Sequence, residues 1–244
     1  MANAAIDLDA AAELGITVCG TRGRPSSVPE LTFGMMIALA RGFVAEDAAV
    51  RSGGWQHTIG PGLAGRTLGL IGLGKLGAAM VPVAHAFDMS VTAWSPHLDE
   101  ERASALAVRA VSREELFSGA DYVSIHMVLA EATRGLVDAT DFARMKPSAY
   151  LVNTSRGPVV DEDALLAALT GGSIAGAALD VYGTEPLPPD DPWRHAPRTL
   201  LLPHLGYVTT EGYETYFRDV VEDVASFRAG CPVRVLSRPV EGPG

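Results

Sequence analysis

The middle of the chain alternates short apolar runs with segments of helical spacing. The apolar runs cover residues 67–71, 90–94, 122–126, 150–153, 174–180 and 199–202. Helical segments separate several of them, notably 75–87 and 161–169, and the second begins at Asp161, a residue type that caps helices well. Short buried strands that alternate with helices are typical of a parallel sheet covered on both faces. The pattern therefore predicts an α/β fold with a doubly wound parallel sheet.

The two ends of the chain depart from this alternation. Their patterns predict a helix over 6–14, a strand over 15–19, a long helix over 30–51, a closing amphipathic helix over 209–227 and a frayed tail over 239–244. Pro25 and Pro29 mark a break before the long helix, and Gly53 and Gly54 end it. Because a lone helix and strand cannot bury a face by themselves, residues 1–20 are expected to be the end of a larger unit.

Composition narrows the classes of function. The 244 residues are 48% hydrophobic and 20% charged, with a formal net charge of −10. An acidic chain gains nothing from a phosphate backbone or an anionic membrane surface, so neither nucleic acid nor membrane is an expected partner. Cys19 and Cys231 lie too far apart for a CxxC motif, which favours reduced thiols in a cytoplasmic protein. His57, His85 and His195 lack metal-ligand spacing, so no metal site is predicted.

A glycine-rich segment follows the apolar run at 67–71 and opens a helical segment. Gly72, Gly74 and Gly77 have the G-x-G-x-x-G spacing, which in this context is typical of a dinucleotide-binding loop. The first glycine permits the tight turn, the second lets the backbone approach the pyrophosphate, and the third lets helix and strand pack closely. The backbone amides of Lys75 and Leu76 would then point at the diphosphate from the positive end of the helix. The segment predicts a Rossmann domain that binds NAD(P).

The end of the second apolar run bears on the choice between NAD and NADP. An acidic residue is typical there, because it holds the ribose hydroxyls, but this chain has Ser95. The missing carboxylate removes one obstacle to the 2′-phosphate of NADP. No Arg or Lys stands at 95–98 to bind that phosphate, and Asp99, Glu100 and Glu101 follow. We therefore expect NAD, with NADP as the alternative and His97 as a solvated loop residue.

Three more segments each begin at the end of an apolar run, where doubly wound sheets place their ligands. They are 151–161 (LVNTSRGPVVD), 176–187 (GAALDVYGTEPL) and 202–207 (LPHLGY). Together with the glycine-rich loop, their order and spacing resemble the D-2-hydroxyacid dehydrogenase family, from Asn3 to about Phe227. The resemblance implies reversible reduction of a 2-keto acid by NAD(P)H, as in glyoxylate or hydroxypyruvate reductases and phosphoglycerate dehydrogenases.

The chemistry of such a reduction needs the residue types found in these segments. Arg156 supplies planar, permanently charged donors for the substrate carboxylate and the polarised keto oxygen. His204 suits proton delivery to that oxygen because its ordinary pKa lies near neutrality. Glu185 is the carboxylate expected to orient the imidazole and favour its protonated form. The family uses the matching residues in these catalytic roles.

The resemblance also implies further cofactor contacts. Asp180 matches the aspartate that binds the nicotinamide carboxamide, and the backbone at Gly206 passes the nicotinamide. The other implied cofactor-lining residues are Thr154 and Ser155 beside Arg156, and Met127 or Val128 beside the adenosine half. His126, which ends an apolar run, is expected to have a structural or peripheral role.

The family also has a flavodoxin-like substrate domain that begins well before Asn3. The resemblance therefore implies that the chain is shortened at its N-terminus and divides into a remnant of that domain (1–27), a linking helix and arm (28–60), the NAD(P)-binding Rossmann domain (61–206) and a helix returning to the substrate domain with a tail (207–244). The linking helix implies a homodimer. The alternatives to an active enzyme are a corepressor-like NAD(H)-binding protein and a catalytically impaired binding protein.

Overall fold

The computed structural model describes residues 6–24 and 26–237. The chain divides into two compact units, one within 1–27 and 207–244 and the other formed by 28–206. The expected frayed tail at 239–244 lies outside the described residues. Each unit is described here by itself, beginning with the larger one.

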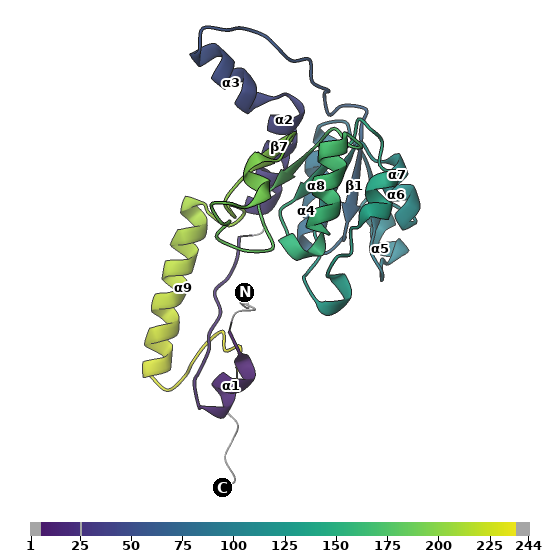
Figure 1. The fold of residues 1–244 in the computed structure, drawn as a ribbon. Coiled ribbons are helices and arrows are strands. Elements are labelled where there is room, and N and C mark those ends of the chain that lie inside the picture. Colours follow the sequence, from purple (N-terminus) through teal and green to yellow (C-terminus); the bar gives the residue numbers. More distant parts are fainter. Residues whose placement is uncertain (1–5, 25, 238–244) are drawn as a thin grey trace. The chain divides into compact units, whose positions relative to one another are not determined.

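The unit 28–206 is built on a seven-stranded, entirely parallel sheet (Figure 1). Its strands are β1 (Thr67–Ile71), β2 (Ser90–Trp94), β3 (Arg109–Ala110), β4 (Tyr122–Ile125), β5 (Tyr150–Asn153), β6 (Gly176–Leu179) and β7 (Thr199–Leu201). The strand order is β3-β2-β1-β4-β5-β6-β7, so the order reverses at β1 and β4. The six strands that the apolar pattern predicts are confirmed. The two-residue β3 is too short to leave such a pattern.

Helices cover both faces of this sheet, which confirms the doubly wound α/β fold. The helices between strands are α4 (Lys75–Ala86), α5 (Glu100–Ala105), α6 (Arg113–Gly119), α7 (Ala139–Arg144) and α8 (Glu162–Gly171). Alternate strand residues point to opposite faces. Leu68 and Leu70 thus join one apolar core, while Ile71 and Leu151 join the other. The predicted cap of α8 is confirmed, because the Asp161 side chain accepts a hydrogen bond from the backbone N–H of Ala164.

The single long helix expected over 30–51 is wrong. The chain forms α2 (Ser27–Ala40) and α3 (Phe43–Arg51), whose axes differ by 60°. Gly42 lies between them with φ +64°, a left-handed conformation that glycine adopts without the steric cost of a side chain. Figure 1 shows α3 and the following segment standing apart from the sheet.

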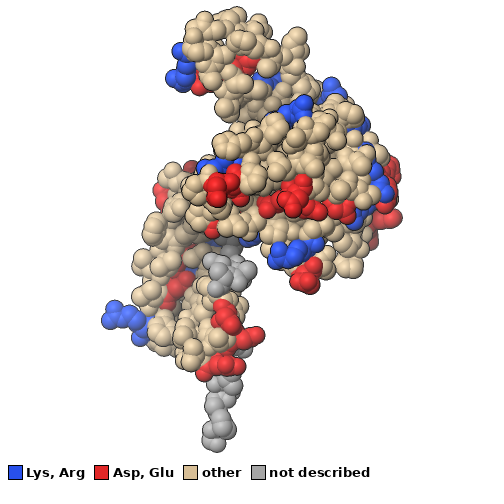
Figure 2. Space-filling view, viewed as in Figure 1, with Lys and Arg blue, Asp and Glu red and all other residues tan. Residues whose placement is uncertain are grey.

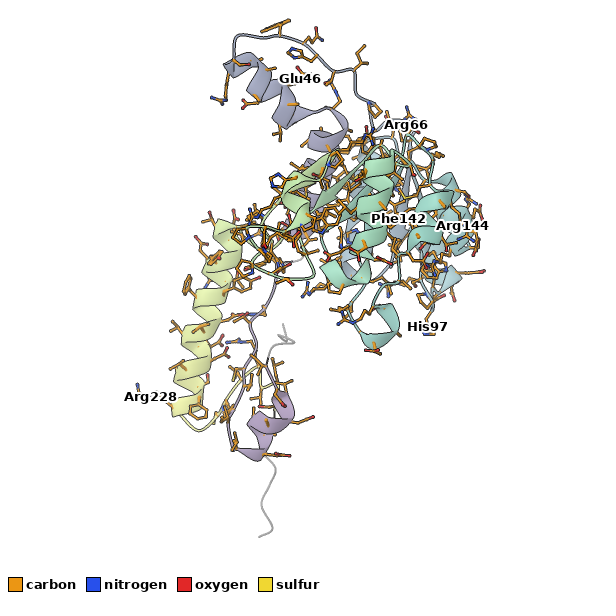
Figure 3. The ribbon with its side chains drawn as sticks, viewed as in Figure 1. Glu46, Arg66, His97, Phe142, Arg144 and Arg228 are labelled. Atoms are coloured by element: carbon orange, nitrogen blue, oxygen red, sulfur yellow. The ribbon has the colours of Figure 1, made fainter. Side chains whose placement is uncertain are left out.

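The segment after α3 is tied back to that helix through one carboxylate. Glu46 Oε1 accepts hydrogen bonds from the backbone N–H and the hydroxyl of Thr58 (2.8 and 2.7 Å) and from the backbone N–H of His57 (3.1 Å). Glu46 is labelled on α3 in Figure 3. These bonds give a defined shape to the segment 52–60, which we call the arm, although no residue of α3 is buried.

The described residues of the smaller unit include the helices α1 (Leu8–Glu13) and α9 (Thr210–Arg228). The strand expected over 15–19 is reduced to one antiparallel bridge between Cys19 and Val235, because the neighbouring residues find no longer strand to pair with in the described chain. Asp219 on α9 is fully buried and accepts hydrogen bonds from the backbone and the guanidinium of Arg22. Arg234 adds ion pairs with Glu222 (2.8 Å) and Asp223 (2.9 Å).

The apolar residues of α9 lie on its exposed side. Six large hydrophobic side chains, each between 41% and 69% accessible, follow a spacing of three or four residues: Tyr213, Phe217, Val220, Val221, Val224 and Phe227. We call these residues the α9 stripe. Within the described ranges, no single helix has the length and apolar character needed to cross a membrane, and only the bent pair α2–α3 meets those criteria jointly.

Candidate active site

The loop between β1 and α4 is a tight turn built on its three glycines. Gly72 has φ +95°, and its N–H donates to the carbonyl oxygen of Trp94 on β2 (2.8 Å). A Cβ at Gly77 would lie 2.1 Å from the Gly72 carbonyl oxygen, so helix and loop touch backbone to backbone. A Cβ at Gly74 would meet nothing within 4 Å, and Gly74 is the N-cap of α4. The space at Gly74 is therefore open at the N-terminus of α4, the end of a helix that favours anions.

The segment after β2 is acidic and ordered by its own side chains. Ser95, directly after the strand, is half-buried, and His97 lies exposed in the next turn (Figure 3). The carboxylate of Asp99 caps α5 by accepting hydrogen bonds from the N–H groups of Glu101 and Arg102. The Asp99 carboxylate therefore stabilises the N-terminus of α5. It lies a few residues after the strand end where a ribose would bind.

The residues that follow β4 line the glycine loop. A Cβ at Gly72 would lie 2.8 Å from the carbonyl oxygen of His126 and 2.9 Å from Sδ of Met127. The imidazole Nε2 of His126 is 3.0 Å from the hydroxyl of Ser124, and burial lowers the pKa of His126 to about 4. Val128, one residue further, is 82% exposed. An uncharged His126 packed against the loop agrees with the structural role expected for it.

The turn after β5 presents Arg156. The buried amide of Asn153 accepts from the N–H of Ser155 (3.0 Å) and donates to the carbonyl oxygen of Arg156 (3.0 Å), which fixes the turn. The hydroxyl of Ser155 donates to the Met127 carbonyl, and the hydroxyl of Thr154 pairs with that of Thr32 on α2 (3.0 Å). The Arg156 side chain is exposed, so its guanidinium is accessible from solvent.

Glu185 and His204 meet beside this turn, from the loops that follow β6 and β7. Glu185 Oε2 lies 2.6 Å from His204 Nδ1, and the other carboxylate oxygen accepts the N–H of Tyr182 (2.9 Å). Both side chains are about one third exposed. Because Nδ1 faces the carboxylate, Nε2 is the ring nitrogen on the opposite side of the imidazole and can carry a proton to a substrate.

Asp180 fixes the backbone next to His204. His204 has φ +57°, a left-handed conformation that costs a non-glycine residue roughly 1–2 kcal/mol. The buried carboxylate of Asp180 accepts the N–H groups of Leu205 (2.6 Å) and Gly206 (2.8 Å). Burial raises the pKa of Asp180, and these two bonds partly offset that effect. The carboxylate therefore holds the strained turn in place.

Two supporting residues are absent from the sequence-based prediction. Asn153 shapes the Arg156 turn, and Tyr182 links the loops, since its hydroxyl donates to the Leu202 carbonyl (3.0 Å) and its N–H to Glu185. A polar residue ending an apolar run was a usable signal for Asn153. Nothing in the sequence distinguishes Tyr182 from an ordinary core residue.

All predicted site residues thus gather at the edge where the parallel strands end. Residues 33–206 match the NAD-binding domain of the D-isomer specific 2-hydroxyacid dehydrogenases. The chain therefore belongs to this family and carries its NAD-binding domain.

Relatives and solved structures give the same assignment. The chain is 38% identical to the D-3-phosphoglycerate dehydrogenase of Bacillus subtilis over 93% of its own length and 44% of that protein. It is 37% identical to the glyoxylate reductase of Korarchaeum cryptofilum over 96% of its length and 73% of that protein. A crystal structure described as a D-3-phosphoglycerate dehydrogenase oxidoreductase from Ralstonia solanacearum superposes with a TM-score of 0.89 at 33% identity, covering 94% of this chain and 71% of that one. The chain spans less than half the length of the phosphoglycerate dehydrogenases of Bacillus subtilis, Synechocystis and Archaeoglobus fulgidus.

Proposed function

We propose that this protein transfers a hydride between NAD(H) and a 2-keto acid or D-2-hydroxy acid. The observation that carries the proposal is the 2.6 Å contact between Glu185 and His204, at the same sheet edge as the Arg156 turn and the glycine loop. NADH, when bound, supplies the hydride that reaches the keto carbon.

The protein contributes binding and proton transfer. His204 is the proposed acid, which gives a proton from Nε2 to the keto oxygen during reduction and takes it back in the reverse direction. Glu185 holds the imidazole through Nδ1, which leaves Nε2 as the ring nitrogen for the substrate. Arg156 is the proposed partner of the substrate carboxylate, because a guanidinium binds a carboxylate with two parallel hydrogen bonds.

The proposed cofactor contacts follow the same edge. The glycine loop and the N–H groups of Lys75 and Leu76 hold the diphosphate; the adenosine half lies near Ser95, Met127 and Val128; the nicotinamide half lies near Thr154, Ser155, Asp180, His204 and Gly206. The buried Asp180 carboxylate, which accepts the N–H groups of Leu205 and Gly206, fixes the backbone that the nicotinamide half would pass. The acidic segment 99–101 supports NAD over NADP.

The proposed substrates are small 2-keto acids such as glyoxylate and hydroxypyruvate. Their support is the 37% identity to a glyoxylate reductase that the chain matches over most of its length. A small acid also needs few contacts beyond a carboxylate clamp and a proton donor, and both are supplied by the unit 28–206.

The proposed domain division assigns 1–27 and 207–244 to a substrate domain, 28–60 to a linking helix and arm, and 61–206 to the cofactor domain. The exposed α9 stripe supports this division, since an apolar helix face normally packs against further chain. The proposed location is the cytoplasm, where the free thiols Cys19 and Cys231 would stay reduced.

The proposed partner is a second copy of the chain, bound through α3 and the arm. Five exposed apolar residues support this assembly: Phe43, Val44, Val50, Trp55 and Ile59. The uppermost part of the surface in Figure 2, which is α3 and the arm, carries few charged side chains. Burial of such a patch between two copies removes apolar area from water.

The test is the initial rate of NADH or NADPH oxidation with glyoxylate, hydroxypyruvate, pyruvate and phenylpyruvate. We expect turnover with NADH and at least one of these acids, and loss of turnover in Arg156→Ala. Arg144→Ala, an exposed arginine on α7, is the matched control and should keep the wild-type rate. NADH binding without turnover for any acid would defeat the proposal and favour a cofactor-binding regulator instead.

A further inference from the structure

Glu162, the first residue of α8, is a half-buried carboxylate outside the proposed chemistry. Burial raises its pKa, and the negative charges of Asp191, Asp163 and Glu185 act in the same direction. Its Oε1 accepts the backbone N–H of Gly183 at 2.9 Å. This hydrogen bond offsets part of the cost of holding a carboxylate there, and it connects α8 to the loop that carries Glu185.

The loop around Gly183 is packed backbone to backbone. A Cβ at Gly157 would lie 2.1 Å from the carbonyl carbon of Tyr182 and 2.5 Å from the nitrogen of Gly183. A Cβ at Gly183 would itself lie 2.5 Å from Oε2 of Glu162. The turn that follows Arg156, the Tyr182–Gly183 peptide and the Glu162 carboxylate therefore touch in series.

The same loop sets the position of Glu185. The N–H of Tyr182, one residue before Gly183, donates to Oε1 of Glu185, whose other oxygen meets His204. A displacement of Gly183 would move the Tyr182 N–H and with it the Glu185 carboxylate. Misplacement of a catalytic group by about 1 Å can cost on the order of 100-fold in rate.

We propose that Glu162 is a positioning residue, which holds the loop 182–185 against Gly157 through its hydrogen bond to Gly183 and so keeps Glu185 in contact with His204. The inference rests on the proposed function for its catalytic consequence. Its structural part, the position of Glu185 against His204, can be measured without turnover.

The kinetic test compares three substitutions of Glu162. Glu162→Ala removes the acceptor, Glu162→Asp shortens it by one methylene, and Glu162→Gln keeps a carbonyl acceptor while removing the charge. We expect kcat to fall by about 10- to 100-fold in the Ala and Asp variants with an unchanged Kd for NADH, and to stay within about threefold of wild type in the Gln variant. Asp163→Ala, an exposed carboxylate on the same turn, is the control and should be silent.

The second measurement uses the protein without cofactor. The ring signals of His204 are recorded by NMR, assigned by their loss in His204→Gln, and compared with those of Glu185→Gln. We expect Glu162→Ala and Glu162→Asp to move these signals towards their positions in Glu185→Gln, and Glu162→Gln to leave them in place. Unmoved signals in the Ala and Asp variants, or a Gln variant that behaves like Ala, would overturn the proposal. Absence of turnover in the wild type would defeat the proposed function alone, since the NMR comparison would still decide the role of Glu162.

Discussion

The two compact units bury opposite kinds of side chains. In 28–206, apolar side chains from both faces of the sheet fill two cores, and Leu70, Phe117 and Leu151 have no accessible surface. In the smaller unit, the buried side of α9 carries Asp219 and Asp223, while its apolar stripe is exposed. A helix normally buries its apolar stripe. The unit 28–206 therefore has an apolar core of its own, whereas in the described part of the smaller unit α9 buries carboxylates in place of its apolar stripe.

The largest effect should come from matched substitutions in the two units. Phe117→Ala empties a fully buried position of the sheet core and should cost about 3–5 kcal/mol of unfolding free energy. Phe217→Ala makes the same change on the α9 stripe, where the ring is 67% exposed, and should stay within about 0.5 kcal/mol. Urea denaturation followed by fluorescence measures both. Equal losses of unfolding free energy in the two variants would contradict the difference in burial between the two units.

A second effect concerns acid stability of the larger unit. Burial lowers the pKa of His126 to about 4 in the folded protein. Between this pH and the ordinary histidine pKa near 6.5, the unfolded chain binds a proton at His126 and the folded chain does not. Stability should therefore fall as the pH drops from about 6.5 to 4, by at most about 3 kcal/mol. His126→Gln should flatten this fall, and the exposed His97→Gln should not. A pH series of thermal melting temperatures checks the difference.

The smaller unit should respond at lower pH. Hydrogen bonds from the Arg22 side chain and backbone hold the pKa of Asp219 well below its usual range. A carboxylate of this kind stabilises the fold above its unfolded pKa of about 4, and the contribution is lost as the pH falls further. The protection factor of the Arg22 amide, which donates to Asp219, should decrease only below that value when hydrogen exchange is measured over a pH series. In Asp219→Asn the amide should exchange rapidly at neutral pH; continued protection would contradict the role of the ion pair.

The smallest change in stability is expected on the α9 stripe itself. Val224→Glu replaces a 55% exposed apolar residue and should alter the unfolding free energy by no more than about 0.5 kcal/mol. It should nevertheless weaken any association beyond the dimer proposed at α3, because an exposed apolar patch favours contact between copies. Sedimentation velocity over a range of concentrations tests this. A large loss of stability would mean that the stripe is already covered within the chain.

Most of the sheet was predictable from the sequence because β1, β2, β4, β5 and β6 are largely buried on both faces and read as continuous apolar runs. The short elements β3, α5, α6 and α7 were not, since two to seven residues carry too little periodicity, although the side chains of Asp99, Ser112 and Asp138 cap the helices. The break at Gly42 was also hidden, because the apolar spacing continues through it while the backbone turns by 60°.

The residues of the candidate site also divide into those that the sequence predicts and those that only the structure reveals. Arg156, Glu185 and His204 follow strand ends, so the sequence alone indicated that they would share an edge. Asn153 acts within the Arg156 turn itself. Tyr182 and Glu162, the other two groups that hold them, make contacts between segments that follow different strands. Such contacts have no fixed spacing along the chain, and only the folded geometry reveals them.

The close approach at Gly157 has a consequence for how the protein tolerates mutation. Any side chain there would meet the Tyr182–Gly183 peptide, which is backbone and cannot rotate away. In a saturation scan of all positions, residue 157 should therefore be as intolerant as its neighbour Arg156, although it takes part in no chemistry. Substitution next to Arg156 is therefore limited by backbone packing at Gly157 as much as by the proposed chemistry of Arg156. Adaptation to a new substrate would have to proceed through other positions.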